Sequence, residues 1–232
     1  MRLTKDHSEE KEILITEEEL SLCIRRLHLC FVIVNDPSMI FVSHLKPIIM
    51  VLLELHVRIN FGVSHLKDPV EQILQRFLRY SAKSMSLATI KTFVLGNYSE
   101  ATELRYKFEP MLEQFAFVPG EGGGIKAIGK AFKKAEEQSF YVADDEKAII
   151  LVDLLQVDKN LEVEVFLSLL SDLSCLIKEE HEMNTSLDLT KAKSSHEEEL
   201  LQLERDLDRT MNGLRRRLMI IRMIGLMGED DR

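Results

Sequence analysis

"GEGGGIKAIGKAF", residues 120–132, is the segment on which the choice between a nucleotide-binding fold and another architecture depends. Gly124, Gly129 and Lys130 have the spacing of the phosphate-binding loop G-x-x-x-x-G-K-[ST]. Ala131 stands where that loop needs a hydroxyl group to hold magnesium. A phosphate-binding loop also follows a buried strand and opens a helix, among alternating strands and helices. The sequence on either side of residues 120–132 has no such alternation.

The same segment has a second interpretation, as a β-hairpin. "FAFVP" (115–119) and "GIKAIGK" (124–130) are short apolar runs that favour strands, and "GEGGG" supplies the turn between them. We therefore predict a small β-hairpin near 115–130 and interpret the phosphate-loop spacing as a coincidence. A nucleotide-dependent enzyme that uses Gly124, Lys130 and Asp153 stays as a rival hypothesis.

Helix start and stop signals dominate the rest of the sequence. Thr16 and Glu19 form a capping-box pattern ahead of an apolar stripe, and Asp36–Pro37 marks the end of that helix. Asp68 as N-cap, with Pro69 at the first helical position, predicts another helix start. Further helices are predicted from Ser38 with a break at Pro47, from Ser84 to Val94, from Ser99 to Phe115, from Asp144, and from Asn160 or a neighbour.

Helices joined by short linkers predict an all-α chain, an α-solenoid of antiparallel helix pairs. "SHLK" occurs at 43–46 and at 64–67, which is too short a match to set a repeat period. The predicted organisation is a flexible N-terminus at 1–15, a helical-repeat region at 16–178 with the hairpin at 115–130, a polar linker at 179–195, and one or more helices of the array at 196–228.

Composition excludes several classes of protein. The 232 residues are 45% hydrophobic and 30% charged, as in an ordinary folded protein. A net charge of -9 argues against a nucleic-acid binder, which needs a basic face. Three cysteines at unrelated spacings indicate a reducing compartment, so the expected location is the cytoplasm. The apolar run from Pro47 to Leu55 is too short to span a bilayer and is predicted to be a core helix.

No residue pattern in the sequence defines a catalytic, metal or cofactor site. The seven histidines lack the paired-histidine spacing of zinc proteases. Cys23 and Cys30 are seven positions apart, but no further histidine or cysteine lies at a metal-ligand spacing. We therefore predict no catalytic residue, no metal ligand and no cofactor.

The C-terminal segment "GLRRRLMIIRMIGLMGEDDR" carries the basic cluster Arg215, Arg216 and Arg217 beside apolar residues. Such a helix can lie on a membrane surface or dock in the groove of a partner protein. The favoured interpretation is the core face of a solenoid helix whose next neighbour is missing. The acidic "GEDD" disfavours anionic lipid. The three arginines are the candidate partner or membrane contact.

The order of segments along the chain carries a family resemblance. It runs through "SHLKDPVEQILQRFL", "SMSLATIKTFVLG" and "FAFVPGEGGGIKAIGKA", then an acidic spacer, "DDEKAIILVDLLQ", "VFLSLLSDLS", and finally "EEELLQLERDLDRT" with "RRRLMIIRMIGLM". Over most of residues 16–228 this order resembles the middle region of the transport and Golgi organization protein 6 family. Members of that family are large HEAT/armadillo-type proteins, so the resemblance implies a HEAT/armadillo-like solenoid.

The resemblance also implies a function. It implies a non-catalytic scaffold in protein secretion and Golgi organisation, and the family brings no catalytic residues. Fungal relatives imply an alternative, an adaptor for RNA polymerase II assembly or nuclear import. Because family members are much longer, we expect a central fragment that lacks neighbouring repeats. The expected partners are proteins, not nucleic acid, with peripheral contact to Golgi or endoplasmic reticulum membranes.

Overall fold

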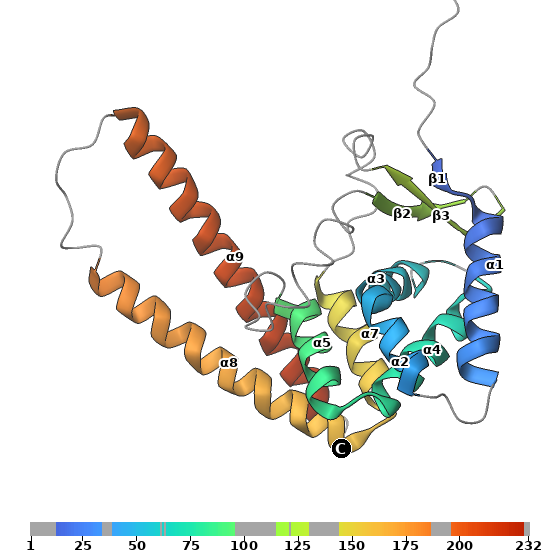
Figure 1. Cartoon of the computed structure of the whole chain (residues 1–232). Coiled ribbons are helices and arrows are strands. Elements are labelled where there is room, and N and C mark those ends of the chain that lie inside the picture. Colours follow the sequence, from blue (N-terminus) through green and yellow to red (C-terminus); the bar gives the residue numbers. More distant parts are fainter. Residues whose placement is uncertain are drawn as a thin grey trace, which may run out of the picture. The chain divides into compact units, whose positions relative to one another are not determined.

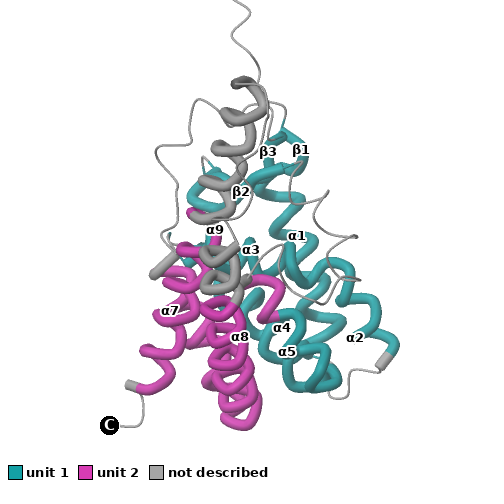
Figure 2. Tube along the Cα trace, turned by 90° about the vertical axis from the view of Figure 1, so that its left-hand side faces the viewer, with its two compact units in different colours: residues 1–89, 100–143 teal, residues 90–99, 144–232 magenta. Residues whose placement is uncertain are grey.

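The computed structural model describes residues 13–33, 39–60, 62, 64–95, 115–120, 122–129, 144–186 and 196–229 (Figure 1). They belong to two compact units, residues 1–89 with 100–143 and residues 90–99 with 144–232, coloured separately in Figure 2. Helices dominate both, and a small antiparallel sheet is inserted in unit 1. The predicted helix at 99–115 falls on residues outside the described part, except for Phe115, which begins a strand.

The described residues of unit 1 form four α-helices, the first part of a fifth, two irregular helical turns and three strands. In chain order these are β1 (Ile13–Ile15), α1 (Glu17–His28), a π-helical turn (Leu29–Ile33), α2 (Met39–Leu45), a 3-10 turn (Lys46–Ile48), α3 (Ile49–Asn60), α4 (Lys67–Tyr80), α5 (Lys83–Leu95), β2 (Phe115–Pro119) and β3 (Ile125–Gly129). From Ile90 onward α5 is part of unit 2.

Helix α1 begins at the capping box predicted from the sequence. The Glu19 N–H donates to Thr16 Oγ1 at 3.3 Å, and the Thr16 N–H donates to Glu19 Oε2 at 3.0 Å. Two backbone donors that the first turn leaves without helical partners are satisfied in this way. Leu20, Ile24 and Phe31 from the predicted apolar stripe are buried, which fixes the inner face of the helix.

Two helix boundaries follow the prolines. The predicted break at Pro47 is confirmed, because a 3-10 turn at Lys46–Ile48 separates α2 from α3. The predicted start of α4 was two residues late. The helix begins at Lys67 after Leu66, so Asp68 is not the cap and Pro69 is the third helical residue. Proline is tolerated there because the N–H groups of a first helical turn have no intrahelical acceptor.

Three side-chain hydrogen bonds join α1 and its π-helical turn to α4 at one constant offset. Each pair is 44 positions apart, at 2.9, 2.7 and 2.8 Å: Ser21 with His65, His28 with Gln72, and Val32 with Arg76. A constant offset requires the two segments to run parallel, side by side. They are therefore equivalent first helices of successive units, at a period within the roughly 40–47 residues of HEAT and armadillo repeats.

The hairpin predicted near 115–130 is confirmed, and it is part of a larger sheet than expected. Strands β2 and β3 pair antiparallel from Phe115 opposite Gly129 to Pro119 opposite Ile125. Strand β1 pairs with the other edge of β3, giving the order β1-β3-β2. Its residues lie in the N-terminus predicted to be flexible at 1–15, so that prediction was wrong for 13–15, while 1–12 lie outside the described residues.

The sheet and the helices share one core within unit 1. Strand β3 packs on α1, and β2 packs on α3. Phe117, Ala127 and Ile128 from the sheet are buried, as are Ile73 and Phe77 from α4. The sheet thus covers one end of the helix layer and holds the glycine-rich turn near the start of α1 (Figure 1).

Unit 2 contains the end of α5 together with α7 (Asp144–Leu155), α8 (Lys159–Ser186) and α9 (His196–Glu229). Asp158 Oδ1 accepts from the N–H groups of Asn160 and Leu161 at 3.0 and 3.2 Å. Asp158 therefore caps α8, which begins at Lys159, close to the start predicted at Asn160 or a neighbour. Helix α7 packs against both α8 and α9, and Leu151 is fully buried. The Lys91 Nζ of α5 lies 2.9 Å from Asp172 Oδ2 of α8.

The boundary of the predicted polar linker was misplaced. Helix α8 continues to Ser186, into the segment 179–195 that was predicted to be a connector. The remaining positions, 187–195, lie outside the described residues, and α9 then begins at His196. The first part of that segment, residues 179–183, contains three glutamates and a methionine, which have high helix propensity, so its polarity alone was a poor indicator of a linker.

In the part of the chain that the structure describes, one helical stretch of 21 residues, Ile40–Asn60, has the length and composition of a membrane span, and half of it is buried inside the protein. Core helices of folded proteins meet the same criterion. Leu53, Val57 and Ile59 from this stretch are fully or almost fully buried against the rest of unit 1. Within the shorter run Pro47–Leu55, most apolar residues are buried, as the sequence predicted for a core helix, whereas Ile40 and Phe41 at the start of the stretch are exposed.

Candidate functional site

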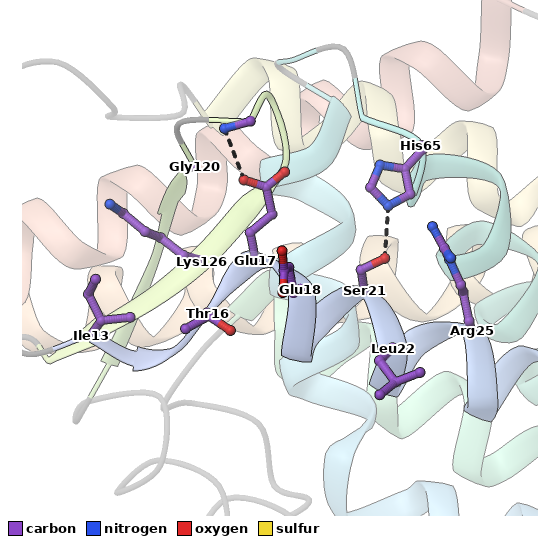
Figure 3. Close-up of a pocket in the computed structure, with 11 residues that line it drawn as sticks. Ile13, Thr16, Glu17, Glu18, Ser21, Leu22, Arg25, His65, Gly120 and Lys126 are labelled. Atoms are coloured by element: carbon purple, nitrogen blue, oxygen red, sulfur yellow. Dashed lines mark hydrogen bonds between the residues drawn. The ribbon is translucent and has the colours of Figure 1, made fainter.

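The glycine-rich turn opens on a groove between α1 and the sheet. The groove has a volume of about 810 Å³ and is open to solvent. Its lining comes from β1, the start of α1, the loop before α4, the glycine-rich turn and β3: Ile13, Thr16, Glu17, Glu18, Ser21, Leu22, Arg25, His65, Gly120, Gly122 and Lys126. Figure 3 shows these side chains around the first two turns of α1.

The turn is closed by its own backbone and holds a carboxylate from α1. The Gly120 N–H donates to the Gly124 carbonyl at 2.7 Å, and Gly123 has a φ of 83°, which favours glycine. The Gly122 N–H donates to Glu17 Oε2 at 3.2 Å (Figure 3). An acidic side chain of this protein therefore lies where an external anion would meet the backbone N–H groups of the turn.

The absence of side chains from the turn is what lets Glu17 approach. A Cβ atom at Gly120 or Gly124 would overlap the Glu17 carboxyl group, and one at Gly122 would crowd it. A Cβ atom at Gly129 would meet nothing within contact distance. The glycines that surround Glu17 are thus required for close approach, whereas the glycine that completes the phosphate-loop spacing is not.

The residues of the rival nucleotide site do not form a phosphate-binding loop. Residues 125–129, which would be the loop interior and its closing glycine, are strand β3. Gly124 ends the turn of a hairpin, so no helix starts there. Lys130 and Ala131 lie outside the described residues. Asp153 is an exposed residue on α7, in the other unit.

A serine–histidine pair lies in the groove, and no motif in the sequence indicated it. Ser21 Oγ is 2.9 Å from His65 Nε2, although the two residues are 44 positions apart. Nucleophilic catalysis also requires a group that orients the histidine and donors for an oxyanion. Among the described residues no carboxylate is hydrogen-bonded to His65. The pair therefore ties α1 to the loop before α4.

The groove carries charges of both signs. Arg25 on α1 and Lys126 on β3 line it together with Glu17 and Glu18 (Figure 3). In the described part of the chain, neither basic side chain has a carboxylate within ion-pair distance. Mixed charge on an open surface suits contact with a protein better than with a polyanion.

The predicted contact residues Arg215, Arg216 and Arg217 lie on α9, in unit 2. Arg215 is exposed, whereas Arg216 and Arg217 are partly buried. Each of the three interacts with other residues of the chain. Arg217 Nε reaches the Gly213 carbonyl at 3.5 Å. The arginines belong to unit 2, whereas the groove is a feature of unit 1.

The first helices α1 and α4 run parallel at a constant 44-residue offset, with α2 and α3 between them in the chain, which is the arrangement of armadillo-type helical repeats. The family model of the Transport and Golgi organization protein 6 homolog, ARM-like repeat, matches residues 1–161. The chain therefore belongs to this family, and the resemblance seen in the order of its segments is confirmed. No solved structure matches the chain.

Proposed function

We propose that the chain is a non-catalytic helical-repeat scaffold that binds other proteins in protein secretion and Golgi organisation. The family match over residues 1–161 carries this proposal. Stacked helices of an armadillo-type array present continuous surfaces, and proteins of this architecture use such surfaces to bind partners. The proposed location is the cytoplasmic face of Golgi or endoplasmic reticulum membranes.

The candidate site supports binding rather than chemistry. The turn that resembles a phosphate-binding loop is occupied by Glu17, whose carboxylate accepts from Gly122. The Ser21–His65 pair has no orienting carboxylate among the described residues. The open groove between α1 and the sheet, with Arg25 and Lys126, is the proposed contact surface in unit 1.

Proximity labelling of the tagged chain in cells tests the proposal. We expect enrichment of Golgi and vesicle-coat components over a variant that cannot fold, Ile73→Asp, because Ile73 is fully buried. The charge-reversal variant Arg25→Glu with Lys126→Glu should keep the fold and lose part of the enrichment. Enrichment of RNA polymerase II subunits and their assembly factors instead would replace the secretory role with the adaptor role.

A second measurement separates the scaffold from a serine hydrolase. A fluorophosphonate probe labels a serine that a neighbouring histidine activates. The folded chain should remain unlabelled. Labelling that Ser21→Ala abolishes and that an exposed control, Ser43→Ala, leaves intact would show nucleophilic chemistry at the groove and would contradict a purely binding role.

A further inference from the structure

Helix α9 has two apolar faces on opposite sides, and one of them is exposed. The inner face packs on α7 and α8 through Met219, Ile220, Met223 and Met227, which are all buried. The other face carries a row of large apolar residues with exposed fractions of 61, 44, 65 and 52%: Met211, Leu214, Leu218 and Ile221. Their spacing of three and four positions places them on one side of the helix.

The exposed row continues a pattern that reaches toward the beginning of α9. By sequence, Leu200, Leu203 and Leu207 extend the same three- and four-residue spacing. The pattern is symmetric about the point between Thr210 and Met211. Three apolar pairs are equidistant from that point: Leu200 with Ile221, Leu203 with Leu218, and Leu207 with Leu214.

Charged residues beside the row share the same centre of symmetry. Residues 196–210 contain six acidic and two basic residues, whereas residues 211–229 contain four arginines and one glutamate. Three pairs of opposite charge are equidistant from the point between Thr210 and Met211: Glu199 with Arg222, Glu204 with Arg217, and Asp206 with Arg215. The helix is therefore complementary to itself when it is turned end to end.

We infer that α9 is a homotypic interface, and that it pairs antiparallel with α9 of a second copy around a twofold axis between Thr210 and Met211. In this register every exposed apolar residue from 214 to 221 lies opposite a leucine or isoleucine of the other copy. A twofold interface uses the same patch on both copies, so each charge pair forms twice.

Two other arrangements fit the charges less well. A parallel pair would bring the arginines of one copy against those of the other, and like charges facing each other oppose association. A membrane surface would attract the second half of α9 but repel its acidic first half, because cytoplasmic leaflets are anionic. The antiparallel pair satisfies both halves at once.

Sedimentation of the full chain over a concentration series is the first test. We expect a dimer that becomes a monomer in the variant Leu214→Glu with Leu218→Glu, with an unchanged circular dichroism spectrum because both side chains are exposed. The matched control is Val163→Glu with Leu167→Glu, at exposed positions of α8, and it should remain dimeric. A wild-type chain that is monomeric throughout, or a dimer that survives the α9 substitutions, overturns the inference.

Charge exchange tests the register. Arg215→Glu with Arg217→Glu should weaken self-association on the order of tenfold or more, because four favourable pairs become repulsive. Mixing this variant with a chain carrying Glu204→Arg and Asp206→Arg should restore a dimer made of one copy of each. Failure of the mixture to form heterodimers, when each variant alone is weakened, contradicts the proposed pairing.

Cross-linking tests the orientation. In a chain whose Cys23, Cys30 and Cys175 are replaced by serine, Met211→Cys should oxidise to a covalent dimer because residue 211 lies beside the axis. Ile221→Cys should not, because it lies opposite residue 200 of the other copy. Oxidation of Ile221→Cys to a covalent dimer as readily as Met211→Cys indicates a parallel pair and overturns the inference. A monomeric chain that floats with phosphatidylserine vesicles, and that Arg215→Glu with Arg217→Glu releases, would show that the row contacts lipid instead.

Discussion

Glu17 is the residue that gives the glycine-rich turn its role in this protein. Its carboxylate accepts a hydrogen bond from Gly122, 105 positions later in the chain, and joins the start of α1 to the hairpin. A glycine-rich turn exposes backbone N–H groups to an anion whether the anion is a phosphate or a carboxylate. The glycines of the turn indicate that an anion approaches its backbone closely, but the local sequence does not indicate whether that anion is a phosphate or a carboxylate.

Gly124→Ala tests this contact at the scale of one side chain. The added Cβ would overlap the Glu17 carboxyl group, so Glu17 must move away and lose its bond from Gly122. We expect the free energy of unfolding to fall by about 1–2 kcal/mol, measured by urea denaturation. In a Glu17→Ala background the same substitution should cost much less, since nothing remains to be displaced. Gly129→Ala is the control because its Cβ would meet nothing, and an equal loss there would contradict the account.

His56 makes the stability of unit 1 depend on pH. Burial on α3, assisted by the positive charge of Lys67, lowers the pKa of His56 to about 4. The unfolded chain binds a proton near pH 6.5, whereas folded His56 stays neutral until about pH 4. The free energy of unfolding should therefore be greatest above pH 6.5 and should fall on acidification, by up to about 3 kcal/mol near pH 4.

The slope of stability against pH isolates this effect from the other titrating groups. His56→Gln should flatten the slope between pH 6.5 and pH 4, whatever its effect on stability at neutral pH. His44→Gln, at an exposed histidine, should leave the slope as it is in the wild type. An unchanged slope in His56→Gln would show that another group takes up the proton.

Among the elements, α1 shows how far local signals reach. Thr16→Ala removes the oxygen that accepts from the Glu19 N–H, and loss of such a cap costs about 1 kcal/mol of the free energy of unfolding. Thr16→Ser keeps a hydroxyl group and should cost much less. Thermal unfolding of the three proteins measures the difference. Equal losses in Thr16→Ala and Thr16→Ser would mean that packing of the threonine methyl group, and not the cap, stabilises the helix start.

Capping and proline signals predicted elements well because they act within four residues. The start of α1, the break at Pro47 and the β2–β3 hairpin were all predicted from adjacent residues. Strand β1 was missed because three residues are too few for a periodic pattern, and its partner β3 lies far along the chain. The end of α8 was missed because Glu179, Glu180 and Glu182 favour a helix, but only their polarity was considered.

At the scale of the whole molecule, the repeat is a feature of packing more than of sequence. The 44-residue offset between α1 and α4 appears in hydrogen bonds of Ser21, His28 and Val32, but the residues at equivalent positions are not alike. A repeat needs only matching helix lengths and apolar faces, so its period can survive when its residues change. The family resemblance in the order of segments could therefore be recognised from the sequence. The 44-residue repeat period and the Ser21–His65 contact could be found only in the structure.

The claim that most directly separates a scaffold from an enzyme is that the turn at 120–124 has no role in nucleotide binding. Titration of the folded chain with a fluorescent ATP analogue and magnesium tests it, with Lys130→Ala measured in parallel. We expect no saturable binding to either protein. Saturable binding in the micromolar range that Lys130→Ala abolishes would contradict it, and would make the glycine-rich turn a nucleotide site in spite of Glu17.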